Sequence, residues 1–205
     1  RAPDGLAGAV ALTFMGTRLE GWPAARRAEM AALFSRVAYK KTLEWKEEIV
    51  YLNPAAEGPL KATLPDGTAV TIPAGGDPRE AFADWLLTPG NPWFARNIVN
   101  RLWAWTMGRG VIHEADDIRP DNPPACPELL AYLEDELVQS KYDLRHVFRL
   151  ILNSRTYQQS SLPPSAKPEA EKLCAYYPLR RLDAEVLADA LAWIGGTGEK
   201  YVSPI

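Results

Sequence analysis

The sequence predicts a mainly α-helical fold, in which long proline-rich loops join irregular helices and a small β-hairpin lies near residues 47–72. Three observations carry this prediction. Apolar residues recur at helical spacing through much of the chain. A Pro65-Asp66-Gly67 turn signal separates two short β-prone runs. The chain of 205 residues contains 18 prolines, which indicate long ordered connections between its elements.

The first 76 residues are expected to contain two helices followed by β-structure. The expected elements are helices at residues 5–20 and 22–39 and β-prone runs at residues 47–52, 60–64 and 68–72. The second helix has Pro23 in its first turn, where a missing N–H costs little. Residues 73–76 form a linker, so we expect the chain to divide into a region at 1–73 and a helical domain at 77–205.

The second half of the chain is predicted to be helical, with long connections. Helices are expected to start at Asp77 and Asn91, to span residues 127–140 with Leu130, Leu133 and Leu137 buried, and to start again at Asp143 and Asp183, the last ending at Gly195-Gly196. The helix after Asn91 should place Phe94, Ile98, Leu102 and Trp105 on one face, and should end at Gly108. Residues 110–126 and 162–172 are predicted to be a loop and a linker.

Composition and charge exclude some classes of partner. A net charge of −3 and a pI near 5.5 argue against nucleic acid as the main partner. No apolar run approaches the roughly 18–20 residues that a membrane helix needs, so we expect no transmembrane segment in this chain, and membrane-surface association stays open. Because the chain starts at Arg1 without Met and ends at Ile205 without a closing element, we interpret it as an internal piece of a longer polypeptide.

The sequence lacks the usual signals of cofactor and metal sites. Cys126 and Cys174 are far apart in sequence, and a disulfide bond and two buried thiols are equally compatible with them. Their spacing matches no metal motif. With two His, no Gly-rich phosphate loop and no redox motif, no cofactor is expected.

A set of polar residues in the second half forms the candidate site. Its members are Arg96, Asn100, Arg101, Arg109, His113, Asp116, Asp117, Arg119, Asn153, Arg155, Arg180 and Arg181. Arg96, Asn97, Asn100 and Arg101 share a helix face opposite Phe94 and Ile98. They could grip an anionic or sugar-like ligand. The favoured alternative is that they tie the loop at 110–126 to the helix, because that loop must satisfy its backbone polar groups.

The acids of this loop also allow two interpretations. Glu114, Asp116, Asp117 and Asp121, with His113 nearby, could run acid–base chemistry or bind a hard cation. Their spacing is not that of a calcium loop, and Arg109 and Arg119 lie among them, so internal salt bridges are favoured.

Two further polar runs are interpreted as structural and not as functional. Ser154 has no evident base, since His146 lies one or two helical turns earlier, so residues 153–158 are interpreted as a helix end and no catalytic residue is assigned. Arg180 and Arg181 could bind an anion, but a bridge to Asp116 and Asp117 is favoured.

Residues 77–205 contain a series of distinctive segments. In chain order they are Asp77-Pro78-Arg79-Glu80, Asn91-Pro92-Trp93-Phe94-Ala95-Arg96, Val99-Asn100-Arg101-Leu102-Trp103, Gly108-Arg109-Gly110, Asp116-Asp117 with Arg119-Pro120, Asn122-Pro123-Pro124, Pro127-Glu128-Leu129-Leu130, Tyr142-Asp143-Leu144, Ile151-Leu152-Asn153-Ser154-Arg155-Thr156-Tyr157-Gln158 and Arg180-Arg181-Leu182-Asp183-Ala184-Glu185. Together they resemble a family of large bacterial proteins, abundant in planctomycetes, that carry the "fifteen-fifty-three" domain of unknown function.

The resemblance implies an architecture and a periplasmic or otherwise extracytoplasmic setting, but no reaction. Residues 8–52 look like the tail of the companion "fifteen-forty-nine" domain, and such proteins often begin with a cytochrome-c-like module. The companion usually carries a Cys-x-x-Cys-His-type motif after the position of Arg18-Leu19. Here Glu20 runs directly into Gly21-Trp22-Pro23, so the motif is either lost in this member or missing from the chain.

Two functions are expected, and the first is favoured. It is a non-catalytic, membrane-extrinsic interaction or scaffold domain, which serves with other protein subunits as an accessory subunit of a larger, redox-linked assembly. The alternative is a hydrolase that acts on a polysaccharide or its esters, with Asp116, Asp117 and His113 as acid–base groups and Arg96, Asn100 and Arg101 holding substrate. Direct electron transfer is a weaker third hypothesis, because it would require a haem.

Overall fold

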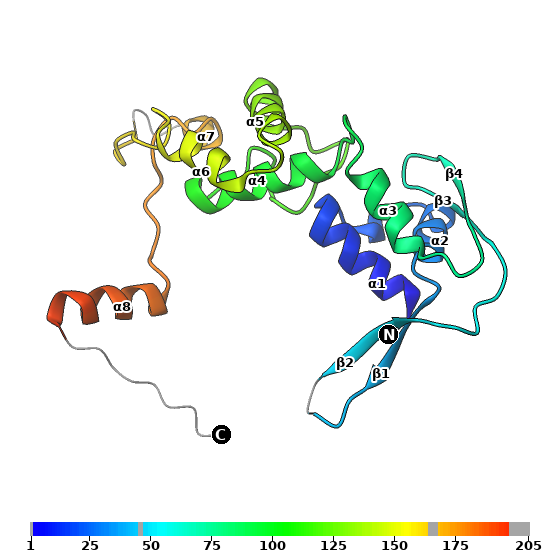
Figure 1. Ribbon diagram of the computed structural model, residues 1–205. Helices are drawn as coiled ribbons and strands as arrows, with labels where there is room; N and C mark the ends of the chain where they lie inside the picture. Colours follow the sequence, from blue (N-terminus) through cyan, green and yellow to red (C-terminus); the bar gives the residue numbers. More distant parts are fainter. Residues whose placement is uncertain (1, 45–46, 164–167, 197–205) are drawn as a thin grey trace.

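The computed structural model describes residues 2–44, 47–163 and 168–196. In chain order the elements are α1 (Pro3–Val10), the π-helical turn η1 (Ala11–Met15), the 3-10 turn η2 (Leu19–Gly21), α2 (Ala24–Ala32), β1 (Val37–Lys41), β2 (Glu48–Leu52), β3 (Leu60–Thr63), β4 (Ala69–Ile72), α3 (Pro78–Leu86), α4 (Phe94–Met107), α5 (Pro127–Gln139), α6 (Leu144–Leu152), α7 (Pro168–Lys172) and α8 (Ala184–Gly195). The mainly α prediction is confirmed (Figure 1). None of the described helices is long and apolar enough to cross a membrane.

The first helix is shorter than the predicted span of 5–20. α1 continues into η1, which ends at Met15 because Gly16 adopts a left-handed conformation with a φ of 62°. A Cβ atom at Gly16 would collide with Oδ1 of Asn97 and with the Ile118 side chain. The end of η1 is therefore in direct contact with α4 and with the loop that follows it.

Residues 33–39, predicted to continue the second helix, form a turn and the start of β1 instead. α2 ends at Ala32, and the side chain of Arg36 is buried just beyond it. Its guanidinium donates to the carbonyl oxygens of Gly58, Pro73 and Gly76. Val37 and Tyr39, a β-branched and an aromatic residue, then continue into a strand that pairs antiparallel with β2. The helical prediction was wrong because these tertiary contacts fix the exit from α2.

The predicted hairpin at 60–72 is confirmed. β3 and β4 pair antiparallel, with Leu60 opposite Ile72. Asp66 stabilises the turn, since its Oδ1 accepts from Thr68 N at 2.9 Å and its Oδ2 accepts from Trp85 Nε1 at 2.8 Å. The β-prone run at 47–52 is the separate strand β2, whose partner is β1.

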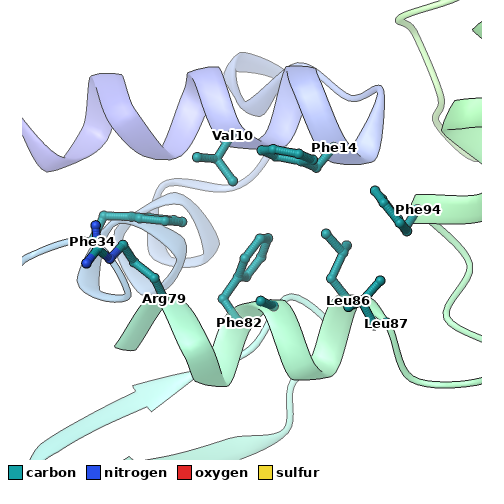
Figure 2. A pocket seen from close by; sticks show the side chains of 9 residues that line it. Val10, Phe14, Phe34, Arg79, Phe82, Leu86, Leu87 and Phe94 are labelled. Carbon is teal, nitrogen blue, oxygen red and sulfur yellow. The ribbon is translucent and has the colours of Figure 1, made fainter. Parts of the chain in front are cut away.

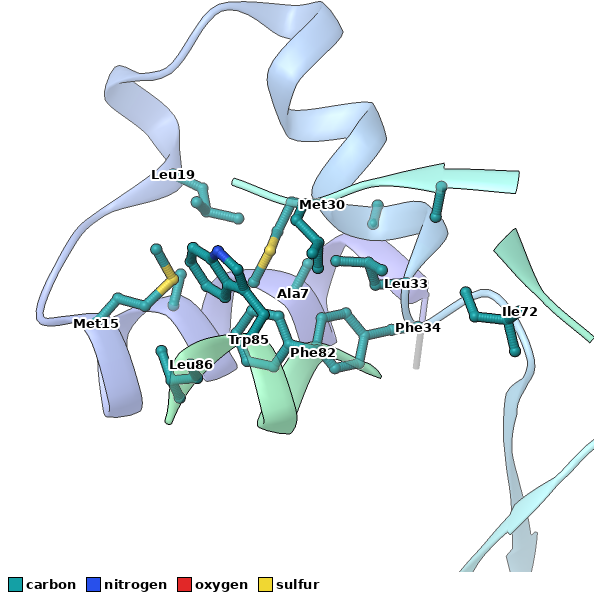
Figure 3. Close-up of a cluster of buried hydrophobic side chains, with 14 residues drawn as sticks. Ala7, Met15, Leu19, Met30, Leu33, Phe34, Ile72, Phe82, Trp85 and Leu86 are labelled. Carbon is teal, nitrogen blue, oxygen red and sulfur yellow. The ribbon is translucent and has the colours of Figure 1, made fainter. Parts of the chain in front are cut away.

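The first of two buried apolar clusters joins α1, η1, α2, the β3–β4 hairpin and α3 (Figure 3). Asp77 caps α3 as predicted, and its Oδ1 accepts from Arg79 N at 2.9 Å. Phe82, Trp85 and Leu86 of α3 lie in this cluster, although α3 follows the 73–76 linker. The helices up to α3 therefore pack in the first cluster, and those from α4 to α6 pack in the second. The division into two domains at residues 73–77 stays a prediction.

The second cluster surrounds α4, which packs against α5 and α6. Its core consists of Val99, Leu102, Trp103, Met107, Leu130, Leu133, Leu137, Val147 and Ile151, with neighbouring residues. The predicted burial of the three leucines of α5 and the cap of α6 by Asp143 are confirmed. On α4, Leu102 of the predicted apolar face is buried, Trp105 of the same face is 65% exposed, and Trp103 fills the core. Asn97 and Asn100 are also buried, because η1 and the loop that follows α4 cover the polar side of this helix.

The C-terminal part has fewer packed residues. The short helix α7 lies inside the predicted linker at 162–172, of which residues 164–167 are outside the described residues. α8 ends as predicted, with Gly196 in a left-handed conformation, but the expected cap by Asp183 makes no side-chain hydrogen bond. Figure 1 shows α8 after an extended segment and away from the other helices. No residue of α8 is buried.

Candidate functional site

Asn100 of α4 is the residue around which the following loop folds. Its side chain is fully buried. Its Nδ2 donates to Ile112 O at 3.0 Å and to Ala115 O at 3.1 Å, and its Oδ1 accepts from Ile112 N at 2.8 Å. The loop backbone at Gly110 lies so close to Ile112 and to the Asn100 amide that a Cβ atom at Gly110 would collide with Ile112 O. The predicted role of the α4 polar residues in tying down the loop is confirmed for Asn100, since a buried amide with both groups bonded fixes one conformation.

Arg101 joins the loop to the N-terminal part of the chain. Its Nε donates to Asp116 Oδ1 at 2.7 Å, and its two terminal nitrogens donate to Thr13 O at 2.9 Å and Leu12 O at 2.8 Å. The Nδ2 of Asn97 donates to the same Thr13 oxygen at 2.8 Å. The last carbonyls of a helix have no partner within it. Arg101 and Asn97 therefore cap the C-terminal end of η1 while Arg101 also holds Asp116.

Three charged side chains, those of Asp117, Arg119 and Asp121, follow the anchored part of the loop, and we call them the charged ridge. The Nε of Arg119 donates to Asp117 Oδ2 and its Nη1 to Asp121 Oδ2, both at 3.1 Å. The side chains of Arg119 and Asp121 are more than half exposed, and that of Asp117 is 30% exposed. Exposed ion pairs of this kind contribute roughly 0–1 kcal/mol each to stability. The ridge residues thus face solvent at little cost to the fold.

Two hollows flank this ridge, and Arg18, Asp117 and Arg119 line both of them. The larger one, of about 570 Å³, lies between residues 17–23 and the ridge, and we call it the Trp hollow. Trp22 and Trp93 are in its wall, with ring centroids 6.2 Å apart, and the guanidinium of Arg26 lies 3.7 Å above the Trp22 ring. The smaller one, the acidic hollow, has a volume of about 340 Å³, and Glu114 and Asp116 contribute to it.

Two predicted members of the site lie elsewhere. Arg96 pairs with Glu134 of α5, with Nε to Oε1 at 2.7 Å, and does not line either hollow. Arg180 was expected to bridge to Asp116 and Asp117, and this was wrong. Its guanidinium donates to Trp105 O at 2.8 Å and to Thr106 O at 2.9 Å. The last carbonyls of a helix have no partner within the helix, so they accept hydrogen bonds from other groups. The C-terminal end of a helix also favours a cation.

The remaining candidates are dispersed. His113 forms an exposed pair with Glu114 at 3.0 Å. Arg109 is half-buried, and its Nε has no hydrogen-bond partner among the described residues. Arg155 and Arg181 are exposed. Asn153 donates to Arg149 O at the end of α6.

The end of α6 has the predicted structural character. Ser154 Oγ donates to Ile151 O at 2.6 Å and accepts from Tyr157 N at 3.1 Å. His146 contacts Glu136 at 2.6 Å instead of Ser154. The interpretation of this polar run as a helix end is confirmed.

Chemically, the ridge and the Trp hollow combine ring surfaces, carboxylate acceptors and guanidinium donors, a set that suits a polyhydroxyl ligand. Among the described residues, no group of three or more His, Cys, Asp or Glu is arranged to hold a metal ion. The sequence analysis missed Arg18, Trp22 and Trp93 as neighbours of the ridge. Trp22 and Asp117 are 95 residues apart in sequence, and only the docking of η1 on α4 brings their segments together.

Comparison with known proteins identifies a family. The model of the PSD1 proteins of unknown function (DUF1553) matches residues 78–203. The chain belongs to this family. No curated protein and no solved structure matches the chain. The resemblance of residues 8–52 to a companion domain stays a prediction.

Proposed function

We propose that this member of the PSD1 family is a non-catalytic interaction domain, which acts outside the cytoplasm as an accessory or scaffold subunit of a larger protein assembly. The observation that carries the proposal is the exposed apolar surface of residues 179–194, which we call the C-terminal arm. Its exposed apolar residues are Leu179, Leu182, Val186, Leu187, Leu191, Trp193 and Ile194. So many exposed apolar side chains within one short segment are typical of a surface that another protein covers.

The pattern of α8 indicates how a partner would bind. Val186, Ala190 and Ile194 follow one another at four-residue spacing, and Leu191 lies beside them on the same face. Glu185 and Asp189 lie on the other side. An isolated helix of 12 residues is only marginally stable in water. A partner subunit with an apolar groove and a basic rim would bury the apolar face, stabilise the helix and pair with its acids.

A second apolar surface supports an interaction role. Figure 2 shows a groove between α1 and α3, with a volume of about 320 Å³ and almost wholly apolar walls. Phe82 and Leu86 of α3 face Val10 and Phe14 across it, and Phe94 closes one end. The Phe14 ring is 42% exposed there.

The internal hydrogen bonds of the arginines in the polar cluster support a non-catalytic role. Arg96 is held by Glu134, Arg101 by Asp116 and two carbonyls, and Arg180 by the end of α4. Cations that already bond to protein groups are poorly placed to hold a substrate, because each would have to break its internal bonds first.

The test is to isolate the tagged full-length protein from membrane and periplasmic fractions of its source and to measure the intact mass of the native species. We expect other subunits at fixed stoichiometry, and we expect the double substitution Leu191→Glu/Ile194→Glu to release them. Ala188→Glu places one such charge on the Glu185 side of α8 and should leave the assembly intact. A lone species of the mass of this protein, or release of the subunits by Ala188→Glu as well, would contradict the proposal.

A second candidate function is favoured by one observation: Asp117 lines both hollows, and Trp22 and Trp93 line the larger one with it. It is a hydrolase for a polysaccharide or its esters, in which the tryptophan rings stack on sugar faces and Asp117 serves as an acid–base group. Asp116 is a weaker choice for that role, because Arg101 holds it.

This alternative is tested by incubating the protein with a panel of polysaccharides and acetylated polysaccharides and measuring reducing ends and free acetate. If it is right, the wild type releases one of these products, Asp117→Asn loses at least 90% of the rate and Trp22→Ala raises KM. Asp84→Asn, at an exposed acid of α3, should match the wild type. No product from any substrate would reject the alternative.

A further inference from the structure

The β1–β2 hairpin projects away from the helices around it (Figure 1). Among the residues that the structure describes, its sheet consists of these two strands alone. Ile49, Val50 and Tyr51 follow one another in β2, so their side chains alternate between the two faces of the ribbon. Each of the three is at least 40% exposed. β2 therefore presents apolar side chains to solvent on both of its faces.

The register of the hairpin decides which backbone groups of β2 are open. Asn53 N donates to Arg36 O at 2.8 Å, which makes this a hydrogen-bonded pair of the antiparallel ladder. Such pairs alternate with pairs that share no hydrogen bond, and in this register Leu52 and Val50 belong to the second kind. Their N–H and C=O groups point away from β1, and these groups have no partner among the described residues.

The two edges of the ribbon differ in charge. β1 contains Lys40 and Lys41, and lysines on an edge strand oppose the addition of another strand. In β2, no charged side chain lies between Glu48 and Leu52. An exposed apolar edge with open backbone groups is a template on which a further strand can pair. The edge of β2 is therefore the one that can accept a strand.

We propose that the strand which pairs with this edge is β2 of a second copy of the chain, antiparallel to the first about a two-fold axis at Val50. Val50 then lies opposite Val50 of the second copy, and the two exchange both of their outward hydrogen bonds. Ile49 lies opposite Tyr51 of the second copy, in a pair without hydrogen bonds, where side chains come closest. Each copy uses the same strand, so the assembly closes as a dimer.

The sequence around β2 suits pairing with itself in this register. Glu48 lies opposite Leu52 of the second copy, so the acids of the two copies stay apart. Like charges directly opposite one another destabilise a sheet. An axis at Glu48 would bring two carboxylates together, and an axis at Leu52 would set Pro54, which has no N–H, opposite Val50. The axis at Val50 avoids both faults.

The dimer has a four-stranded sheet with β1 at each outer edge. Lys40 and Lys41 then lie on the outer strands, where they oppose further growth of the sheet. A contact between two strands of five residues is smaller than a standard protein interface. We therefore expect a weak dimer, with a dissociation constant on the order of 10 μM. α8 takes no part in the contact, so the dimer is independent of the proposed assembly with other subunits.

The first test is sedimentation equilibrium of the purified full-length protein from about 1 to about 200 μM. We expect the mass to rise from one chain to two. Val50→Pro should keep the mass of one chain, because it removes an outward N–H and no bond to β1. Lys41→Pro makes the same change on the outer side of β1 and should dimerise like the wild type. Circular dichroism should show both variants folded.

Three results would overturn the proposal. They are a wild type with the mass of one chain at every concentration, a Val50→Pro protein that still dimerises, and a folded Lys41→Pro protein that does not. Leu191→Glu/Ile194→Glu, the α8 variant, should leave the dimer unchanged. The dimer and the assembly through α8 can therefore fail separately.

The second test uses charge at the axis and does not depend on proline. Val50→Lys and Val50→Glu each set two like charges opposite one another, and each should weaken the dimer at least about fivefold. An equimolar mixture of the two should dimerise more strongly than either alone, because a lysine then faces a glutamate. A mixture that is as weak as the separate variants would overturn the pairing about Val50.

Discussion

The two halves of the loop between α4 and α5 both contain aspartates, but the aspartate of the first half bonds to α4 and those of the second half lie at the surface. In residues 110–116 the backbone is bonded to the buried Asn100 and the carboxylate of Asp116 to Arg101. In residues 117–121 the ion pairs of the charged side chains, among the residues that the structure describes, are with one another, and these side chains line two hollows. Asp116 and Asp117 are adjacent in sequence, yet one supports the fold and the other shapes a surface. The difference lies in the side chains, because the end of η1 bonds to Arg101, which holds Asp116, and to the backbone of Ile118, but leaves the side chains of Arg119 and Asp121 exposed.

The largest expected effect is at Asn100. Asn100→Ala should destabilise the protein by about 3–4 kcal/mol, because three backbone groups of the loop would stay buried without partners. Urea unfolding measures the change. Asn153→Ala removes an exposed amide that bonds to Arg149 O and should cost below about 1 kcal/mol. Equal losses for the two substitutions would mean that Asn100 does not anchor the loop.

The next effect tests the close approach of the loop to α4. Gly110→Ala should cost about 2–3 kcal/mol, because the new Cβ would collide with Ile112 O and crowd the Asn100 amide. Gly5→Ala in α1 is the matched control, since a Cβ there meets no atom within 4 Å. That change should be neutral or stabilise by up to about 1 kcal/mol. A Gly110→Ala protein as stable as the wild type in thermal unfolding would show that the anchored half can shift freely.

A smaller effect separates the two adjacent acids. Asp116→Asn should cost about 1 kcal/mol, because the 2.7 Å pair with Arg101 is only partly exposed. Asp117→Asn, in contact with the more exposed Arg119, should cost less than about 0.5 kcal/mol. Denaturant unfolding of both variants at one salt concentration decides between them. A larger loss for Asp117→Asn would reverse the comparison.

The smallest effect is at Arg119. Arg119→Ala should change the free energy of unfolding by no more than about 0.5 kcal/mol, because both of its ion pairs are exposed. Arg101→Ala is the companion measurement and should cost about 2–3 kcal/mol, since it removes an ion pair and two carbonyl contacts. A strong destabilisation by Arg119→Ala would show that the ridge belongs to the fold and is not a free surface.

Local signals in the sequence predicted local structure well. The Pro65-Asp66-Gly67 turn, the caps at Asp77 and Asp143 and the leucine spacing of α5 each act within a few residues. The role of Asn100 could also be predicted, because a long loop next to a helix needs partners for its backbone.

Features that depend on distant packing could not be predicted. The Arg36 side chain, just after α2, donates to carbonyl oxygens of Gly58 and Pro73. The Arg180 side chain donates to a carbonyl oxygen at the end of α4 and does not bond to the acidic loop. The Trp hollow combines Trp22 with the ridge only because η1 docks on α4. A helical pattern also does not say whether its apolar face is covered, which is why α8 and α5 look alike in sequence and differ in burial.

The capping of η1 by residues of α4 bears on how the molecule unfolds. Arg101 and Asn97 bond to Thr13 O, and Ile118 N donates to Gly16 O at 2.8 Å. Separating the N-terminal segment from α4 would leave these helix-end carbonyls unpaired and would release the loop at the same time. These bonds link the N-terminal cluster to α4 and its loop, so we expect fluctuations that separate the two to expose the amides of the loop to exchange with solvent.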